Sequence, residues 1–219
     1  ARPQALLHAR SAQQAGEMVM ADSILNLCKR STLSDEVLAR LLETVSTLKC
    51  HQADKHLSPY LKHQNPQVQK HAITGLCHNG CTHLSDQLRH FLQDENIHTR
   101  RAAITGFTKL KATWFDTEIT ESLNHPNMNI KKAAADALLE IGTLRTAPLL
   151  IQWIAAHDNQ GLQNRLVNAL KHIAGNDYVP LVLAYLSRAA ESDMTLNKQT
   201  LDAVRTPQGQ LHLLLALNH

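Results

Sequence analysis

Apolar residues recur along this chain with a helical spacing that repeats about every 31 residues. One equivalent position is filled by Val45, Leu76, Phe107, Leu138, Leu170 and Leu201. Apolar residues three positions before and after most of these mark one face of a helix, which we expect to be buried. Lys198 and Asn79 are the exceptions. A small residue directly precedes each position, which predicts that a neighbouring helix approaches closely there.

A second helix is predicted ahead of this one in each repeat. Its apolar stripe is marked by Leu61, Leu92, Leu123, Ile154 and Leu186, each with an apolar residue four positions earlier. Turn-forming residues at 63–66, 94–96, 124–127 and 157–161 separate the two helices. A hairpin of this kind cannot bury its apolar stripe alone, so neighbouring hairpins must stack. The pattern therefore predicts an all-α solenoid of about six helical hairpins.

The register of the repeat sets the expected boundaries. The hairpins are expected at 14–49, 54–80, 84–112, 115–143, 147–175 and 178–205, followed by an apolar terminal helix over 207–219. Residues 1–219 would then form a single repeat domain. Because the chain starts with Ala and not Met, we expect a processed chain or a segment of a longer protein.

Composition agrees with helices joined by short loops. Gly and Pro number only 8 and 7 among 219 residues, which argues against a β-rich chain. Apolar residues make up 43% and aromatics 4%, so the core must be aliphatic. No run of 18 apolar residues exists, so no membrane span is expected. The four cysteines are expected to be free thiols in the cytoplasm.

Two repeats carry the pattern of a known family. Pro66, Val68, Lys70, Ala72 and Leu76 give a turn residue, an aliphatic residue, a basic residue, Ala and Leu in order, and 126–138 repeats this pattern. The repeat at 94–107 departs from it at Thr99. From about residue 40 to 204 the chain thus resembles HEAT repeats, particularly the short bacterial kind named after phycobilisome lyases. The resemblance implies a right-handed, armadillo-like α-solenoid of HEAT-like hairpins. It specifies function poorly, because HEAT repeats serve many roles.

A basic residue occupies one position of three repeats, as Lys70, Arg101 and Lys132. The resemblance to HEAT repeats implies that this residue bonds acidic or carbonyl groups in the inter-helix turns, and we favour that interpretation. The alternative is a stripe that binds phosphates. The net charge is only +3, a weak excess for a dedicated nucleic-acid binder.

Four candidate metal ligands lie within seven residues, at Cys77, His78, Cys81 and His83, with Cys50 and His51 one repeat earlier. A zinc site needs four ligands in a tetrahedral array, usually with two residues between paired cysteines. Here three residues separate Cys77 from Cys81, and no second cysteine pair of this kind follows. We expect no metal and no other cofactor, although metal binding by Cys77, His78 and Cys81 stays open.

Two pairs of residues, Trp114 with Asp116 and Trp153 with Asp158, are similar to the aromatic and acidic residues of HEAT-like alkylpurine DNA glycosylases. Their spacings do not reproduce that pattern, and we expect each Trp to fill a gap between repeats. The chain has no His-Glu dipeptide, nucleophile elbow, phosphate loop or dinucleotide motif. These absences favour a protein without catalytic activity.

The second helix of each hairpin usually lines the concave surface of a solenoid. Two outward positions of these helices form the candidate partner-binding site: Thr74, His78, Thr105, Lys109, Asp136, Glu140, Asn168 and His172. Their charges are mixed, whereas a surface that tracks phosphates should be mainly Lys and Arg. The sequence therefore predicts a non-catalytic scaffold that binds a protein or peptide.

The alternative is a nucleic-acid-binding protein, extending to a DNA-repair enzyme of the glycosylase type. It would gain support if Lys109, Lys171, Arg165 and Arg188 converged with the Lys70 position on one groove.

Overall fold

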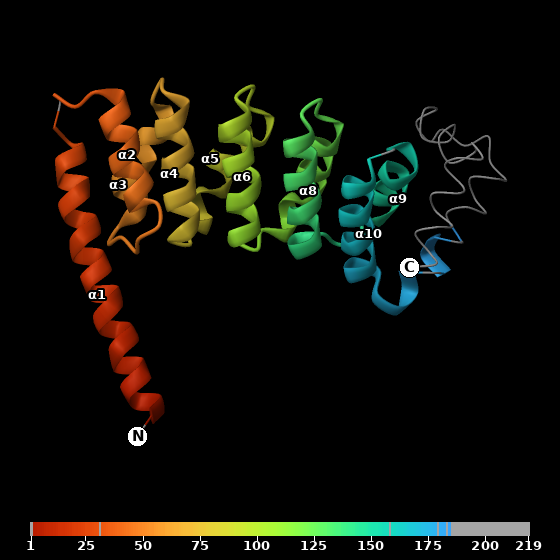
Figure 1. The fold of residues 1–219 in the computed structure, drawn as a ribbon, viewed down its shortest axis with the longest axis horizontal. Coiled ribbons are helices and arrows are strands. Elements are labelled where there is room, and N and C mark those ends of the chain that lie inside the picture. The colour runs from red at the N-terminus through yellow and green to blue at the C-terminus, as the bar shows by residue number, and fades with distance from the viewer. Residues whose placement is uncertain (1, 31, 158, 179, 183, 185–219) are drawn as a thin grey trace. The chain divides into compact units, whose positions relative to one another are not determined.

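Helices make up every regular element that the computed structural model describes, in residues 2–30, 32–157, 159–178, 180–182 and 184 (Figure 1). The predicted all-α solenoid class is confirmed. The chain divides into two compact units, Ala1–Leu110 and Lys111–His219, and each is described by itself below. Most of the hairpin expected at 178–205, including Leu201, lies outside the described residues, as does the whole terminal helix expected at 207–219.

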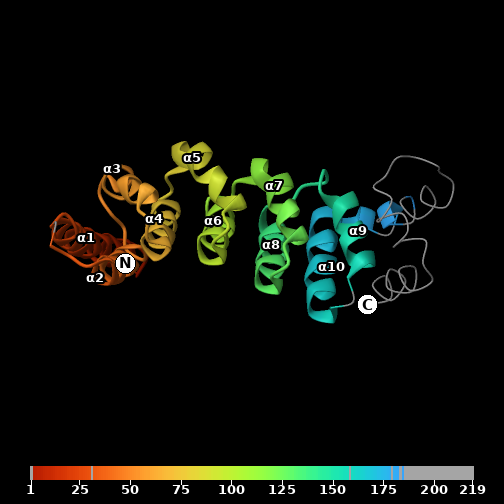
Figure 2. The same cartoon turned by 90° about the horizontal axis from the view of Figure 1, so that it is seen from above.

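Unit 1 contains three hairpins in its described residues. The first pairs α1 (Arg2–Cys28) with α2 (Asp35–Val45), and the second pairs α3 (Ala53–Leu57) and the 3-10 helix η1 (Ser58–Lys62) with α4 (Pro66–His78). The third joins η2 (Thr82–Leu84), α5 (Ser85–Arg89) and η3 (His90–Gln93) to α6 (Ile97–Lys109). Because α4 contacts both α2 and α6, the second helices form one row, with α3 and α5 behind it (Figure 2).

Unit 2 contains two more hairpins in its described residues. The first consists of η4 (Thr113–Phe115), α7 (Asp116–Glu121) and η5 (Ser122–Asn124), followed by α8 (Met128–Ile141). The second pairs α9 (Ala147–Ala156) with α10 (Gln160–Ala174), after which comes η6 (Gly175–Asp177). Helix α10 contacts both α8 and α9. The second helices are therefore neighbours here as well.

Each unit is held together by the apolar positions that the repeat predicts. Leu76 and Phe107 of unit 1 and Leu138 and Leu170 of unit 2 are fully buried, which confirms that part of the pattern. The predicted close approach of helices is also confirmed in unit 1. A Cβ atom added at Gly75 would lie 2.7 Å from Leu57 Cδ1, so no larger side chain fits without movement.

Asparagine begins the second helix of four hairpins and explains where these helices start. The side-chain oxygens of Asn65, Asn96, Asn127 and Asn159 each accept a hydrogen bond from a backbone N–H in the first turn. Such a cap satisfies an N–H group that the helix itself leaves unpaired. In addition, the side chains of His63, Asp94 and His125 accept the N–H of the Asn that follows two residues later. The turn sequences are thus specific caps as well as breaks in the pattern.

Helix α1 departs from the expected boundary at residue 14, because it begins at Arg2. Residues 2–13 lack the spacing of the repeat but are rich in Ala, Leu, Gln and Arg, which are strong helix formers. The helix therefore extends beyond the part that the repeat pattern marks.

Candidate binding surface on the second helices

The predicted partner-binding residues of unit 1 lie on α4 and α6. Thr105 and Lys109 are exposed, whereas Thr74 and His78 are half-buried. The Thr74 hydroxyl donates to the backbone oxygen of Lys70 at 2.9 Å, so it is partly used within the helix. Burial, with help from Lys49 and Lys109, lowers the pKa of His78. His78 is therefore neutral at pH 7, and Lys109 supplies the positive charge of this group.

The predicted residues of unit 2 lie on α8 and α10, and all four are exposed: Asp136, Glu140, Asn168 and His172. Both carboxylates already have cationic partners. Asp136 accepts a hydrogen bond from the Arg165 guanidinium. Glu140 lies 2.6 Å from Lys111 Nζ, and this hydrogen bond and charge lower the pKa of Glu140. The sequence did not predict these ion pairs, each of which joins two residues 29 positions apart.

In unit 1, the positions equivalent to Asp136 and Arg165 hold an acid and a histidine. Glu43 is the repeat equivalent of Asp136, and His71 is the equivalent of Arg165. His71 is only 7% exposed, and the described residues offer it no hydrogen bond. Burial, together with Lys70, lowers the pKa of His71, while Glu43 acts in the opposite direction. A neutral imidazole therefore stands where unit 2 has a guanidinium.

Glu43 and His71 both line a groove of about 430 Å³ between α2 and α4. Asp35, Glu36 and Arg40 of α2 line it as well, as do Asn65 and Gln67 at the start of α4. Three carboxylates thus face a single guanidinium. The sequence predicts the outward faces of the second helices as the site and does not single out His71. The available signal was its position, which holds Arg40 and Arg165 in other repeats.

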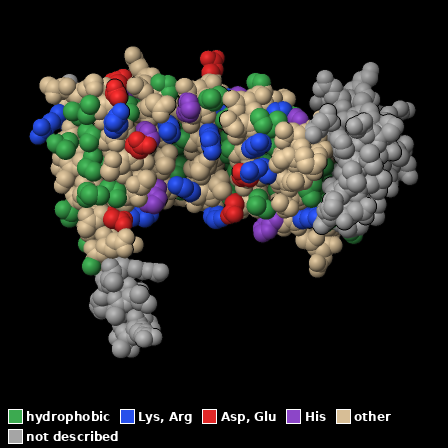
Figure 3. Space-filling model, viewed as in Figure 1, with side chains coloured by type: hydrophobic (Ala, Val, Ile, Leu, Met, Phe, Trp, Pro, Cys, Tyr) green, Lys and Arg blue, Asp and Glu red, His purple; other side chains and the backbone are tan. Residues whose placement is uncertain are grey.

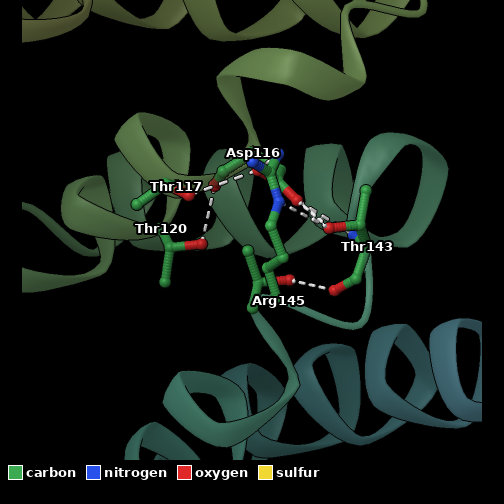
Figure 4. Close-up of polar contacts among 6 residues, drawn as sticks. Asp116, Thr117, Thr120, Thr143 and Arg145 are labelled. Atoms are coloured by element: carbon green, nitrogen blue, oxygen red, sulfur yellow. Dashed lines mark hydrogen bonds and ion pairs between the residues drawn. The ribbon is translucent and has the colours of Figure 1, made fainter.

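Asp116 is fully buried and holds the two hairpins of unit 2 together (Figure 4). Its carboxylate accepts hydrogen bonds from the backbone N–H of Thr143 at 3.1 Å and from Arg145 at 2.9 Å. The hydroxyls of Thr143 and Thr117 donate to the same carboxylate. Because both carboxylate oxygens are occupied by protein donors, Asp116 has a structural role and is not a free catalytic carboxylate.

The two tryptophans differ in their surroundings. Trp114 is 52% exposed, so the expectation that it fills a gap between repeats is wrong. Trp153 stacks on His157 with ring centroids 5.0 Å apart, and Lys131 Nζ lies 5.7 Å from the Trp153 ring. Asp158 lies outside the described residues. The glycosylase-like arrangement of aromatic and acidic groups therefore gains no support from Trp114 or Asp116.

The inter-helix turns are bonded by residues one position away from the predicted basic residues. The Gln69 side chain donates to Leu61 O at 3.3 Å, and the equivalent Gln163 side chain donates to Ile154 O at 3.2 Å. Lys70 instead contacts the Gln67 side chain. Lys70 thus bonds a side chain of its own helix, and the implied bond from Lys70 to a turn carbonyl or turn carboxylate is not found among the described residues.

The cysteine-rich segment contributes to the core. Cys77 and Cys81 are buried, and a Cβ atom at Gly106 of α6 would lie 2.5 Å from Cys77 Sγ. Burial raises the pKa of Cys77 to about 12, so its thiol stays protonated at neutral pH. Within the described part of the chain, no three His, Cys, Asp or Glu side chains gather as a metal site would require.

Comparisons with known proteins agree with the fold. Residues 55–113 match the family model of HEAT repeats. A designed armadillo repeat protein is 15% identical with a TM-score of 0.53, over 90% of this chain and 99% of that one. Crystal structures of two engineered proteins are 11% and 15% identical, with TM-scores of 0.57 and 0.55. They cover 90% and 92% of this chain and 97% and 59% of their own. A search of curated proteins gives no match.

Fold and comparisons together define an α-solenoid repeat protein of the armadillo and HEAT class. Residues 55–113 carry the sequence similarity to HEAT repeats, and the solved structures are similar to this chain in their α-solenoid fold. Repeat proteins of this class bind other molecules through the extended surface that their stacked helices create. Among the described residues, no helix combines the length and the apolar character needed to cross a bilayer.

Proposed function

We propose that this chain is a non-catalytic scaffold that binds a protein or peptide through its second helices. The observation that carries the proposal is the mixture of charges on that surface. Figure 3 shows this face, where basic, acidic and histidine side chains alternate over each unit. Such a surface suits a protein partner, because complementary charges set specificity at protein interfaces. The four cysteines are free thiols, which supports our proposal of a cytoplasmic location.

The positions of the basic residues give the nucleic-acid alternative less support. The Arg165 guanidinium is paired with Asp136, and Lys171 Nζ lies 5.5 Å from the Tyr178 ring centroid. Arg188 lies outside the described residues. Three carboxylates and one guanidinium line the groove of unit 1, and this excess of negative charge repels phosphates.

The test is capture of partners from the native host with the wild-type chain and with charge-reversed variants. Lys109→Glu reverses an exposed charge of unit 1. Glu140→Lys is combined with Lys111→Glu in unit 2, so that the ion pair is kept with its charges exchanged. We expect both variants to fold and to lose the partner, because like charges across an interface cost several kcal/mol.

DNA binding serves as the competing outcome of the same experiment. We expect only weak binding of short duplex and single-stranded DNA at about 0.15 M salt. Submicromolar DNA binding with a steep salt dependence, together with a partner that is indifferent to the charge reversals, would contradict the proposal.

A further inference from the structure

We propose that the groove between α2 and α4 receives an arginine or lysine side chain from a peptide segment of the protein partner. This inference rests on the proposed function, and it adds the location of a subsite and the chemistry of the group that enters it. It follows from the carboxylates of the groove, from the buried His71 and from a comparison with the equivalent position in unit 2.

The carboxylates of the groove are only partly neutralised. Glu36 lies 3.1 Å from the guanidinium of Arg40, so these two charges offset each other. Asp35 lies 3.8 Å from His63 Nε2 and accepts from Asn65 at 3.5 Å. Glu43 forms no ion pair with another described residue. The groove therefore offers a carboxylate that no described residue neutralises by an ion pair.

The structure of helix α2 accounts for two of these acids but not for Glu43. Asp35 and Glu36 are in the first turn of α2, where negative charge is favoured by the helix dipole. Glu43 is in the last turn, where the same dipole disfavours a negative charge. Glu43 thus gains nothing from its place in the helix, and its charge is available to a ligand.

His71 supplies the second group that points to a ligand. Its ring is almost fully buried between α2 and α4, yet it has no hydrogen-bond partner in the described chain. The described side-chain atoms that are both unpaired and sealed from solvent are Thr99 Oγ1 and Arg100 Nε. The ring nitrogens of His71 are therefore reachable, and the groove that His71 lines is the space next to them. Because no described residue bonds these nitrogens, a donor that enters the groove can bond the acceptor nitrogen of the neutral imidazole.

In unit 2, an arginine of the chain itself occupies the position that corresponds to His71. There Arg165 donates to Asp136, at the positions that correspond to His71 and Glu43. A partner's guanidinium in the unit 1 groove would recreate this pair in trans. It carries five N–H donors, enough to bond the Glu43 carboxylate and a neutral His71 nitrogen together.

The experiment uses the full chain and a fluorescein-labelled, acetylated oligo-arginine peptide, followed by anisotropy at about 0.15 M salt. We expect saturable binding that Glu43→Gln weakens about tenfold or more, while an oligo-glutamate peptide does not bind. Glu121→Gln is the control, because it removes one exposed carboxylate of α7 that lies outside both the groove and the candidate partner-binding residues. We expect Glu121→Gln to leave the affinity for the peptide unchanged.

His71 variants test the role of the imidazole. His71→Leu removes the nitrogen acceptor and should weaken binding, whereas His71→Gln keeps an acceptor and should restore much of it. Circular dichroism checks that both variants fold. Because Glu43 is exposed, Glu43→Gln remains informative even if the His71 variants unfold.

Three outcomes would overturn the inference: no binding of oligo-arginine, equal weakening by Glu43→Gln and Glu121→Gln, or binding that Glu43→Gln leaves unchanged. These outcomes are separate from failure of the proposed function. If Lys109→Glu weakens binding of a captured partner and Glu43→Gln does not, only the proposed subsite is contradicted. If the peptide binds at Glu43 but no captured partner is sensitive to changes at Lys109 or Glu140, only the wider proposed function is contradicted.

Discussion

Units 1 and 2 have polar residues at the same repeat positions between neighbouring hairpins, but the basic residue at these positions differs. In unit 2, Arg145 bonds the buried Asp116. In unit 1 the equivalent pair is His83 with Asp54 at 3.5 Å, and these side chains are 62% and 36% exposed. A similar substitution separates Arg165 with Asp136 from His71 with Glu43. An arginine is replaced by a histidine in both cases.

Replacing arginine by histidine changes the charge of the basic residue and, at Glu43, whether the carboxylate is available to a ligand. An arginine remains charged at every pH that a protein experiences, whereas a histidine changes charge near pH 6.5. The joints of unit 2 are therefore permanent ion pairs. In unit 1, burial lowers the pKa of His71 and keeps the imidazole neutral, so Glu43 remains open to a ligand. At this repeat position, arginine thus gives an ion pair between hairpins in unit 2, whereas histidine gives a candidate binding site in unit 1.

The largest expected effect tests what the two units have in common. Leu76→Ala and Leu138→Ala should each cost about 2–5 kcal/mol, because both side chains are fully buried in equivalent positions. Denaturant-induced unfolding measures the loss. A cost below about 1 kcal/mol at either residue would show that the two units do not share one core pattern.

The next largest expected effect distinguishes the buried carboxylate Asp116 of unit 2 from the more exposed Asp54 of unit 1. Asp116→Ala should cost about 3 kcal/mol, because it leaves the Thr143 N–H and Arg145 without their acceptor. Asp54→Ala should cost less than about 1 kcal/mol, the usual contribution of an exposed ion pair. Unfolding by denaturant compares the two variants, and equal losses would contradict the distinction drawn between the units.

A smaller effect concerns pH. Because the native pKa of His71 is lowered, the unfolded chain binds a proton that the native chain resists as the pH falls below about 6.5, the usual value for histidine. Stability linked to His71 is thus present above that pH and is lost as the pH falls toward the native pKa. The free energy difference between wild type and His71→Gln should shrink between pH 7.5 and pH 5.5. A difference that is constant or grows would show that native His71 is not kept neutral.

The smallest effect is expected from the exposed charges of the binding surface. Lys109→Glu should change the free energy of unfolding by less than about 0.5 kcal/mol, because its side chain lies at the surface. Glu140→Lys alone should cost slightly more, since it places a second ammonium beside Lys111. Adding Lys111→Glu should recover that loss. Thermal melts of the single and double variants measure the difference.

Much of the fold could be predicted because each helix carries its own periodic signal. The apolar positions of α4, α6, α8 and α10 and the small residues before them follow the 31-residue repeat. The predicted partner-binding residues lie on the second helices, but the ion pairs that two of them form could not be predicted. Asp136 is neutralised by Arg165 across 29 residues, and such a contact depends on how far one hairpin is offset from the next. His71 was missed for the same reason.

The sequence by itself determined the class of fold, the order of the hairpins and the residues that enter the core. These depend on local spacing, since burial of a helix stripe follows from where apolar residues recur along the chain. Tertiary structure alone decided which polar groups are satisfied. Asp116 became a buried joint because donors from the next hairpin reach it, and Glu43 remained open because a buried, neutral His71 faces it. Charge and hydrogen bonding act through distances in space, which a repeat pattern along the chain does not specify.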